Sequence, residues 1–220
     1  MGEIKSNLQK IKSELPSNVT LVAVSKTKNN ESILQAYNAG QLIFGENYVQ
    51  ELVEKQLSLP QDIKWHFIGH LQSNKVKYIA PFVNLIHGVD SFNLLKEINK
   101  HAQKNNRIIN CLLQVFIAKE ETKFGFDVTE INHFFNSNEY LKYPNVNIVG
   151  FMGMATNTDN TIQIKQEFES LFNLYKLLQQ KFNLSVLSMG MSNDFQLAIS
   201  CGSNMVRIGS LIFGTRNYYK

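Results

Sequence analysis

The sequence predicts a closed barrel of eight parallel β-strands, and two observations support this fold class. Eight short apolar runs recur along the chain, and helical patterns separate them. The runs are continuously apolar rather than alternating, as expected for parallel strands that are buried on both faces. An open doubly wound sheet normally uses fewer strands, so eight of them favour a single (β/α)8 barrel of the TIM type.

Each element of this barrel can be assigned from local pattern. The predicted strands are rich in Val, Ile and Phe, and they span residues 19–25, 42–45, 65–69, 85–89, 109–116, 146–152, 186–189 and 205–208. Helical periodicity covers residues 1–11, 31–37, 48–57, 74–79, 92–104, 129–135, 162–182 and 194–200, and one more helix is expected after the eighth strand. Because no linker or internal repeat interrupts the series, residues 1–220 are predicted to form one domain.

Composition excludes several classes of protein. With 44% hydrophobic and 18% charged residues, the chain is suited to a packed core and is not a disordered protein. The net charge of +4 comes from scattered lysines, so no nucleic-acid partner is expected. No apolar run is long enough to span a membrane, and the N-terminus lacks the apolar region of a signal peptide. The protein is therefore expected to be cytoplasmic, with no membrane partner.

The two cysteines give no sign of a metal site. Cys111 and Cys201 both lie in apolar runs, and neither belongs to a CxxC motif or a Cys/His cluster. Buried thiols are the expected outcome, and no metal is predicted.

A lysine at the end of the first strand is the first candidate for chemistry. In a barrel of this type the site lies at the C-terminal ends of the strands. Strand alternation directs either Lys26 or Lys28 to the interior. Burial at an apolar barrel mouth lowers the pKa of a lysine, and the neutral amine can then condense with an aldehyde. A solvated loop lysine is the alternative interpretation.

The ends of the seventh and eighth strands have the character of a phosphate site, which barrels often form at this place. Gly190 permits close backbone approach, and Ser192 is predicted to cap the helix at 194–200, whose N-terminus suits an anion. Gly209 and Ser210 follow the eighth strand. Plain helix capping is the alternative for Ser192.

Arg207 lies within the eighth strand, where an inward guanidinium is costly unless it has a partner. It is expected to point into the barrel or towards the bottom of a ligand. A structural ion pair is the alternative interpretation for this residue.

Taken together, these residues resemble the pyridoxal phosphate homeostasis protein family over nearly the whole chain. The resemblance is carried by several long motifs that occur in the same order. They are Val24-Ser25-Lys26-Thr27-Lys28 and the segments 44–51, 65–75, 188–195, 206–209 and 213–218.

The resemblance implies that pyridoxal 5'-phosphate is the cofactor and that Lys26 forms an imine with it. It further implies that Ser192, Gly209 and Ser210 hold the phosphate, that Arg207 faces the pyridine nitrogen, and that Asn47 lines the pocket. The implied fold is that of the alanine racemase N-terminal barrel, also called fold type III.

Two substitutions depart from the family pattern, and two histidines need an interpretation. Asn29 stands where the family often has proline, and Ser210 replaces a threonine; neither change removes a needed group. His66 and His70 lie near the third strand end, and core or barrel-mouth roles are favoured for them over catalysis.

Three functions fit the sequence, and a cofactor carrier is preferred. Such a carrier buffers or delivers pyridoxal phosphate to apo-forms of enzymes that use it, has no robust turnover, and is expected to be a monomer. An amino-acid racemase is the alternative, but alanine racemase also uses a C-terminal β domain with a catalytic Tyr, whereas this sequence ends at Lys220. An aldolase-like barrel with a Schiff-base lysine and no cofactor is the third possibility.

Overall fold

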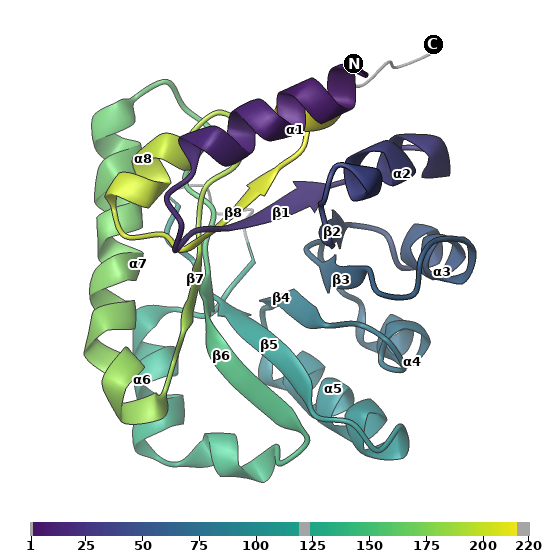
Figure 1. Ribbon diagram of the computed structural model, residues 1–220. Coiled ribbons are helices and arrows are strands. Elements are labelled where there is room, and N and C mark those ends of the chain that lie inside the picture. The colour runs from purple at the N-terminus through teal and green to yellow at the C-terminus, as the bar shows by residue number, and fades with distance from the viewer. Residues whose placement is uncertain (1, 119–123, 215–220) are drawn as a thin grey trace.

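The predicted barrel is present in the computed structural model, which describes residues 2–118 and 124–214. Eight parallel strands close in sequence order, from β1 to β8, and helices surround them (Figure 1). The strands are β1 (Thr20–Val24), β2 (Ile43–Glu46), β3 (Lys64–Phe67), β4 (Leu85–Val89), β5 (Ile109–Gln114), β6 (Val146–Met152), β7 (Val186–Ser188) and β8 (Met205–Ile208). All eight predicted strands are confirmed, and they differ from prediction only at their ends.

The helices follow the predicted pattern with small differences. They are α1 (Glu3–Glu14), α2 (Asn30–Asn38), α3 (Val49–Ser58), α4 (Val76–Ile79), α5 (Phe92–Lys104), α6 (Val128–Asn136), α7 (Thr161–Phe182), α8 (Phe195–Ser200) and α9 (Ser210–Phe213). The predicted helix at 74–79 is a 3-10 turn, η1 (Ser73–Lys75), that continues into α4, and the short η2 (Glu139–Lys142) was not predicted. No helix in the described part of the chain is long and apolar enough to cross a bilayer.

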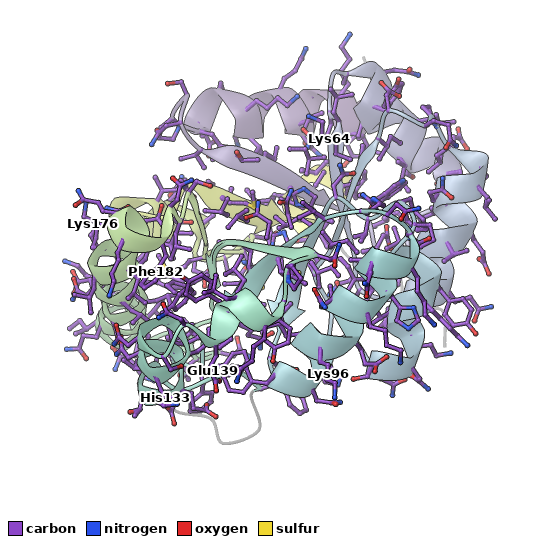
Figure 2. The ribbon with its side chains drawn as sticks, turned by 90° about the horizontal axis from the view of Figure 1, so that it is seen from below. Lys64, Lys96, His133, Glu139, Lys176 and Phe182 are labelled. Carbon is purple, nitrogen blue, oxygen red and sulfur yellow. The ribbon has the colours of Figure 1, made fainter. Side chains whose placement is uncertain are left out.

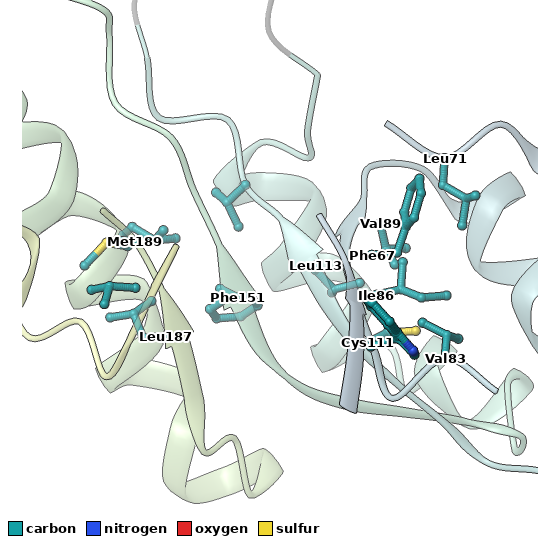
Figure 3. Close-up of a cluster of buried hydrophobic side chains, with 14 of the residues drawn as sticks. Phe67, Leu71, Val83, Ile86, Val89, Cys111, Leu113, Phe151, Leu187 and Met189 are labelled. Carbon is teal, nitrogen blue, oxygen red and sulfur yellow. The ribbon is translucent and has the colours of Figure 1, made fainter. Parts of the chain in front are cut away.

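Two apolar cores lie on opposite faces of the sheet. Alternation along β1 sends Leu21 and Ala23 outward to the larger core beneath the helices, and Val22 inward to the smaller core inside the barrel. Figure 3 shows part of the larger core, including Phe67, Ile86 and Phe151, which are almost fully buried. Burying each such side chain stabilises the fold by about 1.5–3 kcal/mol.

The outer surface carries the charge that the cores exclude. In Figure 2, Lys96 and Lys176 project from the helical rim, and both side chains are exposed. Phe182, at the end of α7, instead packs its ring against Phe135 with 4.5 Å between centroids. Both cysteines are buried free thiols, as expected from their apolar surroundings.

The register of the sheet brings three strand ends together. Ala23 of β1 pairs with Phe44 of β2 on one side and with Ile208 of β8 on the other. Because the strands are parallel, the segments that follow β8, β1 and β2 leave the barrel next to one another at its C-terminal end. The candidate residues from both ends of the sequence therefore meet at this edge.

Candidate ligand-binding site

A cavity of about 240 Å3 lies where these strand ends meet. The twelve residues that line it are Val24, Lys26, Lys28, Asn47, Ile68, Met154, Met191, Ser192, Arg207, Gly209, Ser210 and Gly214. All six residues that the sequence analysis assigned to cofactor binding are among them. Within the segment 213–218, residues 215–218 lie outside the described part of the chain.

Both lysines that follow β1 reach this cavity, and they differ in their surroundings. Lys28 Nζ donates to the carbonyl oxygens of Phe213 at 2.9 Å and Gly214 at 3.3 Å, at the C-terminal end of α9. Lys26 is partly buried and lies in the turn that follows β1, which ends at Val24. Both lysines line the cavity, and the amine of Lys28 is bound to main-chain oxygens of the segment that ends α9.

The backbone around Lys26 forms a tight turn. The amide of Lys28 donates to the carbonyl oxygen of Ser25 at 3.0 Å, and Thr27, at the third position of this turn, has φ of +63°. Positive φ at this position is typical of type II turns and favours glycine. For a β-branched residue such strain costs of order 1–3 kcal/mol and persists only where the surroundings impose it.

An ion cluster lies behind this turn and contacts it. It consists of Glu46 at the end of β2 and of Glu51 and Lys55 on α3, and is called here the α3 ion cluster. Lys55 Nζ donates to Glu46 Oε1 at 2.8 Å and to Glu51 Oε1 at 2.6 Å. Ser25 Oγ also donates to Glu46 Oε1, at 2.6 Å. The cluster therefore joins β1, β2 and α3 at a point outside the barrel.

Burial dominates the electrostatics of Glu46. Its side chain is fully buried, and Oε2 has no hydrogen-bond partner among the described residues. Desolvation raises the pKa of Glu46, although Lys55 and Ser25 act in the opposite direction. The contacts to Oε1 therefore offset only part of the cost of burying this carboxyl group.

The segments after β7 and β8 converge, as the sequence predicted for a phosphate site. Ser192 Oγ accepts a hydrogen bond from the amide of Gly209 at 3.3 Å. Gly209 is the N-cap residue of α9, so a short helix begins at the cavity with Ser210. A short extra helix after the eighth strand is a frequent part of phosphate sites in such barrels.

The prediction that Ser192 caps the following helix is wrong. Helix α8 begins only at Phe195, and its N-cap residue is Asp194. A turn separates Ser192 from the helix, because Asp194 Oδ1 accepts from the amide of Met191 at 2.6 Å and the amide of Phe195 donates to the carbonyl of Met191. Ser192 instead turns towards β8, where it meets Gly209.

Gly190 is required by close packing, as expected. Its φ is +91°, and an added Cβ would lie 2.7 Å from Cβ of Ala198. A side chain at this position would push α8 away from β7. The glycine thus lets the loop that carries Ser192 stay close to the barrel.

Arg207 points into the barrel beneath the cavity and is almost fully buried. Its guanidinium donates to the carbonyl oxygen of Ser188 at 3.0 Å, to Ser188 Oγ at 2.6 Å, and to the carbonyl oxygen of Gly153 at 3.3 Å. None of these acceptors is charged, so within residues 2–118 and 124–214 Arg207 is held by uncharged groups and not by a structural ion pair. Burial lowers the pKa of Arg207 to about 10, and the group stays protonated at neutral pH.

Two buried histidines continue this network. Ser188 Oγ lies 3.2 Å from His87 Nδ1, and His87 Nε2 lies 3.1 Å from His66 Nδ1. Burial lowers the pKa of His66 to about 3 and that of His87 well below its usual value, so both are neutral. Arg207, Ser188, His87 and His66 are called here the barrel network.

The donor and acceptor of each hydrogen bond in the barrel network can be assigned by starting from Arg207. A guanidinium only donates, so Ser188 Oγ accepts from it and has its own proton to give. The remaining polar neighbour of Ser188 Oγ among the described residues is His87 Nδ1. His87 Nδ1 then accepts, and His87 Nε2–H donates to His66 Nδ1.

His70 has a different role from His66. It is exposed, lies 2.9 Å from Asp90 Oδ2, and stacks on the ring of Phe124 with 4.6 Å between centroids. Neither histidine lines the cavity. His66 belongs to the core and His70 to the surface, which agrees with the roles that the sequence favoured over catalysis.

The lining of the cavity suits a small anionic ligand with an apolar body. Asn47 Oδ1 is buried and has no hydrogen-bond partner among the described residues, so it can accept from a donor on such a ligand. Lysine, arginine, hydroxyl and helix N-terminal groups supply the positive end, and apolar walls complete the space. The walls were missed from sequence, because Val24, Ile68, Met154 and Met191 are ordinary apolar residues there.

Comparison with known proteins gives a consistent set of relatives. Residues 1–217 match the family model described as alanine racemase, N-terminal domain. The pyridoxal phosphate homeostasis protein of Aquifex aeolicus is 43% identical over 90% of this chain and 87% of its own length. The human protein of the same name is 41% identical over 91% of this chain and 78% of its own.

Solved structures agree with these relatives. PipY of Synechococcus elongatus, solved with PLP bound, is 34% identical and superimposes with a TM-score of 0.87, covering 96% of this chain and all of its own. An alanine racemase of Clostridium difficile has a TM-score of 0.74 but only 13% identity, and the match covers 99% of this chain and 58% of the racemase. The racemase likeness is one of fold.

Proposed function

We propose, because the chain belongs to the pyridoxal phosphate homeostasis protein family, that it binds pyridoxal 5'-phosphate and serves as an intracellular carrier of it. When bound, this group supplies an aldehyde, a pyridine nitrogen and a phosphate monoester. The observation that carries the proposal is the cavity at the barrel mouth, because one space of about 240 Å3 contains a residue suited to each of these groups.

The proposed roles follow the chemistry of each residue. The amine of Lys26 would hold the aldehyde end of the cofactor as an imine, with water as the other product. Ser192, Gly209 and Ser210 bind the phosphate through a hydroxyl group and the start of α9. Arg207 would face the pyridine nitrogen, and Asn47 would accept a hydrogen bond through Oδ1, which has no partner in the described part of the chain.

The electrostatics of Arg207 fit a carrier, and the names of the relatives favour a carrier over a racemase. The guanidinium is protonated at neutral pH and disfavours a second proton on a pyridine nitrogen beside it. An unprotonated ring is a weaker electron sink for carbanion chemistry. The relatives in the family are named homeostasis proteins, and the alanine racemases share the barrel at 12–16% identity.

Spectroscopy of the loaded protein tests the binding mode. The protein mixed with pyridoxal phosphate is expected to absorb in the visible, and borohydride is expected to attach the cofactor to one peptide that contains Lys26. Lys28→Ala is the matched control, because it removes the neighbouring lysine that binds main-chain oxygens. Trapping on another lysine in Lys26→Ala would overturn the assignment.

Transfer experiments test the carrier role. An apo-enzyme that needs pyridoxal phosphate is expected to regain activity with the loaded protein faster than release into solution allows. A panel of L-amino acids is expected to stay chirally intact. Multiple turnovers of D/L interconversion that are lost in Lys26→Ala would favour the racemase.

Four further features belong to this proposal. The site is expected to act in the cytoplasm, within one domain of residues 1–220, and in a monomer. Apo-enzymes are the proposed recipients of the cofactor.

A further inference from the structure

The turn that carries Lys26 is strained, and its strain sits next to the residue that the proposed function needs most. Thr27 has φ of +63°, in the left-handed region that β-branched residues avoid. A relaxed Thr27 would leave this region, and the adjoining Lys26 would be aimed differently. Some part of the molecule must therefore hold the turn.

Two side chains of α3 form hydrogen bonds with the backbone of the turn, one on each side of Lys26. The amide of Thr27 donates to Glu51 Oε1 at 2.6 Å. On the other side, Lys55 Nζ donates to the carbonyl oxygen of Ser25 at 2.8 Å. The backbone is thus fixed immediately before and immediately after Lys26.

Glu51 and Lys55, which contact the turn, are held in place by further contacts within the α3 ion cluster. Lys55 Nζ bonds to both Glu46 and Glu51, and Ser25 Oγ bonds to Glu46, so the contacts form a closed set. The Lys55 and Glu46 side chains are 6% and 0% exposed, and that of Glu51 is 23% exposed. Hydrogen bonds to ionised groups in such surroundings are strong and directional.

We propose that the α3 ion cluster is a positioning device that holds the Ser25–Lys28 turn in its strained form and so aims the Lys26 amine into the cavity. This inference rests on the proposed function, because the aim of Lys26 matters only if its amine receives an aldehyde. None of the three cluster residues lines the cavity. They act on the ligand through the backbone of the turn.

Two ligands that differ in one group separate positioning from general stability. Pyridoxal 5'-phosphate can bond to Lys26, whereas pyridoxine 5'-phosphate has a hydroxymethyl group instead of the aldehyde and cannot. Glu51→Ala is expected to weaken pyridoxal phosphate binding about tenfold, the effect of losing one hydrogen bond to a charged group. The affinity for pyridoxine phosphate is expected to change less than about twofold.

Relieving the strain is expected to rescue the variant. In Glu51→Ala/Thr27→Gly the turn adopts positive φ without support, because glycine has no Cβ. Pyridoxal phosphate affinity is then expected to return to within about threefold of the wild-type value. Glu51→Gln keeps an oxygen acceptor for the amide of Thr27, and an intermediate loss is expected; it also replaces Glu51→Ala if that variant does not fold.

The outcomes separate this inference from the proposed function. Equal weakening of both ligands in Glu51→Ala, or no rescue by Thr27→Gly, would overturn the positioning role and leave a structural cluster. Failure of the wild-type protein to bond covalently to pyridoxal phosphate would overturn the proposed function instead.

Discussion

Two polar regions flank the candidate site, and they hold their cations in opposite ways. The α3 ion cluster, outside the barrel, surrounds Lys55 with two carboxylates. In the barrel network, inside it, main-chain carbonyls and a hydroxyl bind Arg207, and the neutral histidines follow behind that hydroxyl. Both regions lie next to a residue proposed to touch the ligand.

The difference reflects what each location can supply. Outside the barrel, α3 runs beside β2 and brings Glu51 and Lys55 to one face through their i, i+4 spacing. Inside, the groups that bind Arg207 are uncharged, and burial lowers the pKa of Arg207 to about 10 and that of His66 to about 3. A cation with carboxylate partners anchors backbone, whereas a cation with neutral partners keeps its charge available to the cavity above it.

Removing Lys55 is expected to have the largest effect. Lys55→Met leaves Glu46 and Glu51 close together without their counterion, and breaking a buried pair in this way costs about 3–5 kcal/mol of unfolding free energy. Urea unfolding followed by circular dichroism measures it. Lys96→Met, at an exposed site on α5, is the control and is expected to change stability by less than about 0.5 kcal/mol. Similar losses in the two variants would contradict the buried pair.

Ser192→Ala sharpens the comparison, because this residue belongs to neither region. Loss of a hydroxyl contact to a charged phosphate is expected to cost about 1.5–3 kcal/mol, or roughly tenfold or more in affinity. Fluorescence titration with pyridoxal phosphate measures the change. Thermal unfolding of the ligand-free variant provides the control and should stay near the wild-type value. An unchanged dissociation constant would count against the phosphate site.

Interrupting the barrel network is expected to have a somewhat smaller effect on stability. His87→Phe fills a similar volume, but the hydroxyl proton of Ser188 loses its acceptor and His66 Nδ1 loses its donor. Buried polar groups that lose their partners cost about 1–3 kcal/mol. Urea unfolding again gives the value. A loss as large as that of Lys55→Met would show that the neutral network is no less sensitive than the charged cluster.

The two regions are expected to change the unfolding free energy in opposite directions as the pH falls. His66 titrates near 6.5 when unfolded and at about 3 when folded, so the unfolded chain binds more protons between these values. Its contribution is complete above about pH 6.5 and is lost as pH falls, by up to about 1.4 kcal/mol per pH unit. Burial shifts the pKa of Glu46 upward, which acts in the opposite direction.

A histidine variant measures how much the barrel network contributes to this loss of stability at low pH. His66→Gln is expected to flatten the decline in unfolding free energy between pH 6.5 and 5, compared with the wild-type protein. Equilibrium urea unfolding at several pH values measures both slopes. Identical slopes in the two proteins would be inconsistent with a buried neutral His66.

The strands of the barrel and several residues of the cavity could be predicted from local sequence pattern. Continuous apolar runs identified the strands because a parallel strand is buried on both faces whatever its neighbours are. Lys26, Arg207 and Gly209 stood out because chemistry in such barrels lies at strand ends, which local pattern locates well. Ser192 was found for the wrong reason, since its loop turns towards β8 instead of capping α8.

The two polar regions were decided only by tertiary structure. Glu51 and Lys55 look like an ordinary i, i+4 pair on a helix surface, and His87 looks like one polar residue in an apolar strand. Their roles depend on contacts such as Glu46 with Lys55 and His87 with Ser188, which lies 101 residues further along the chain. Packing of α3 against β2 creates the first contact, and assembly of the barrel creates the second. Both contacts are buried, and the pKa values and the turn conformation depend on this burial.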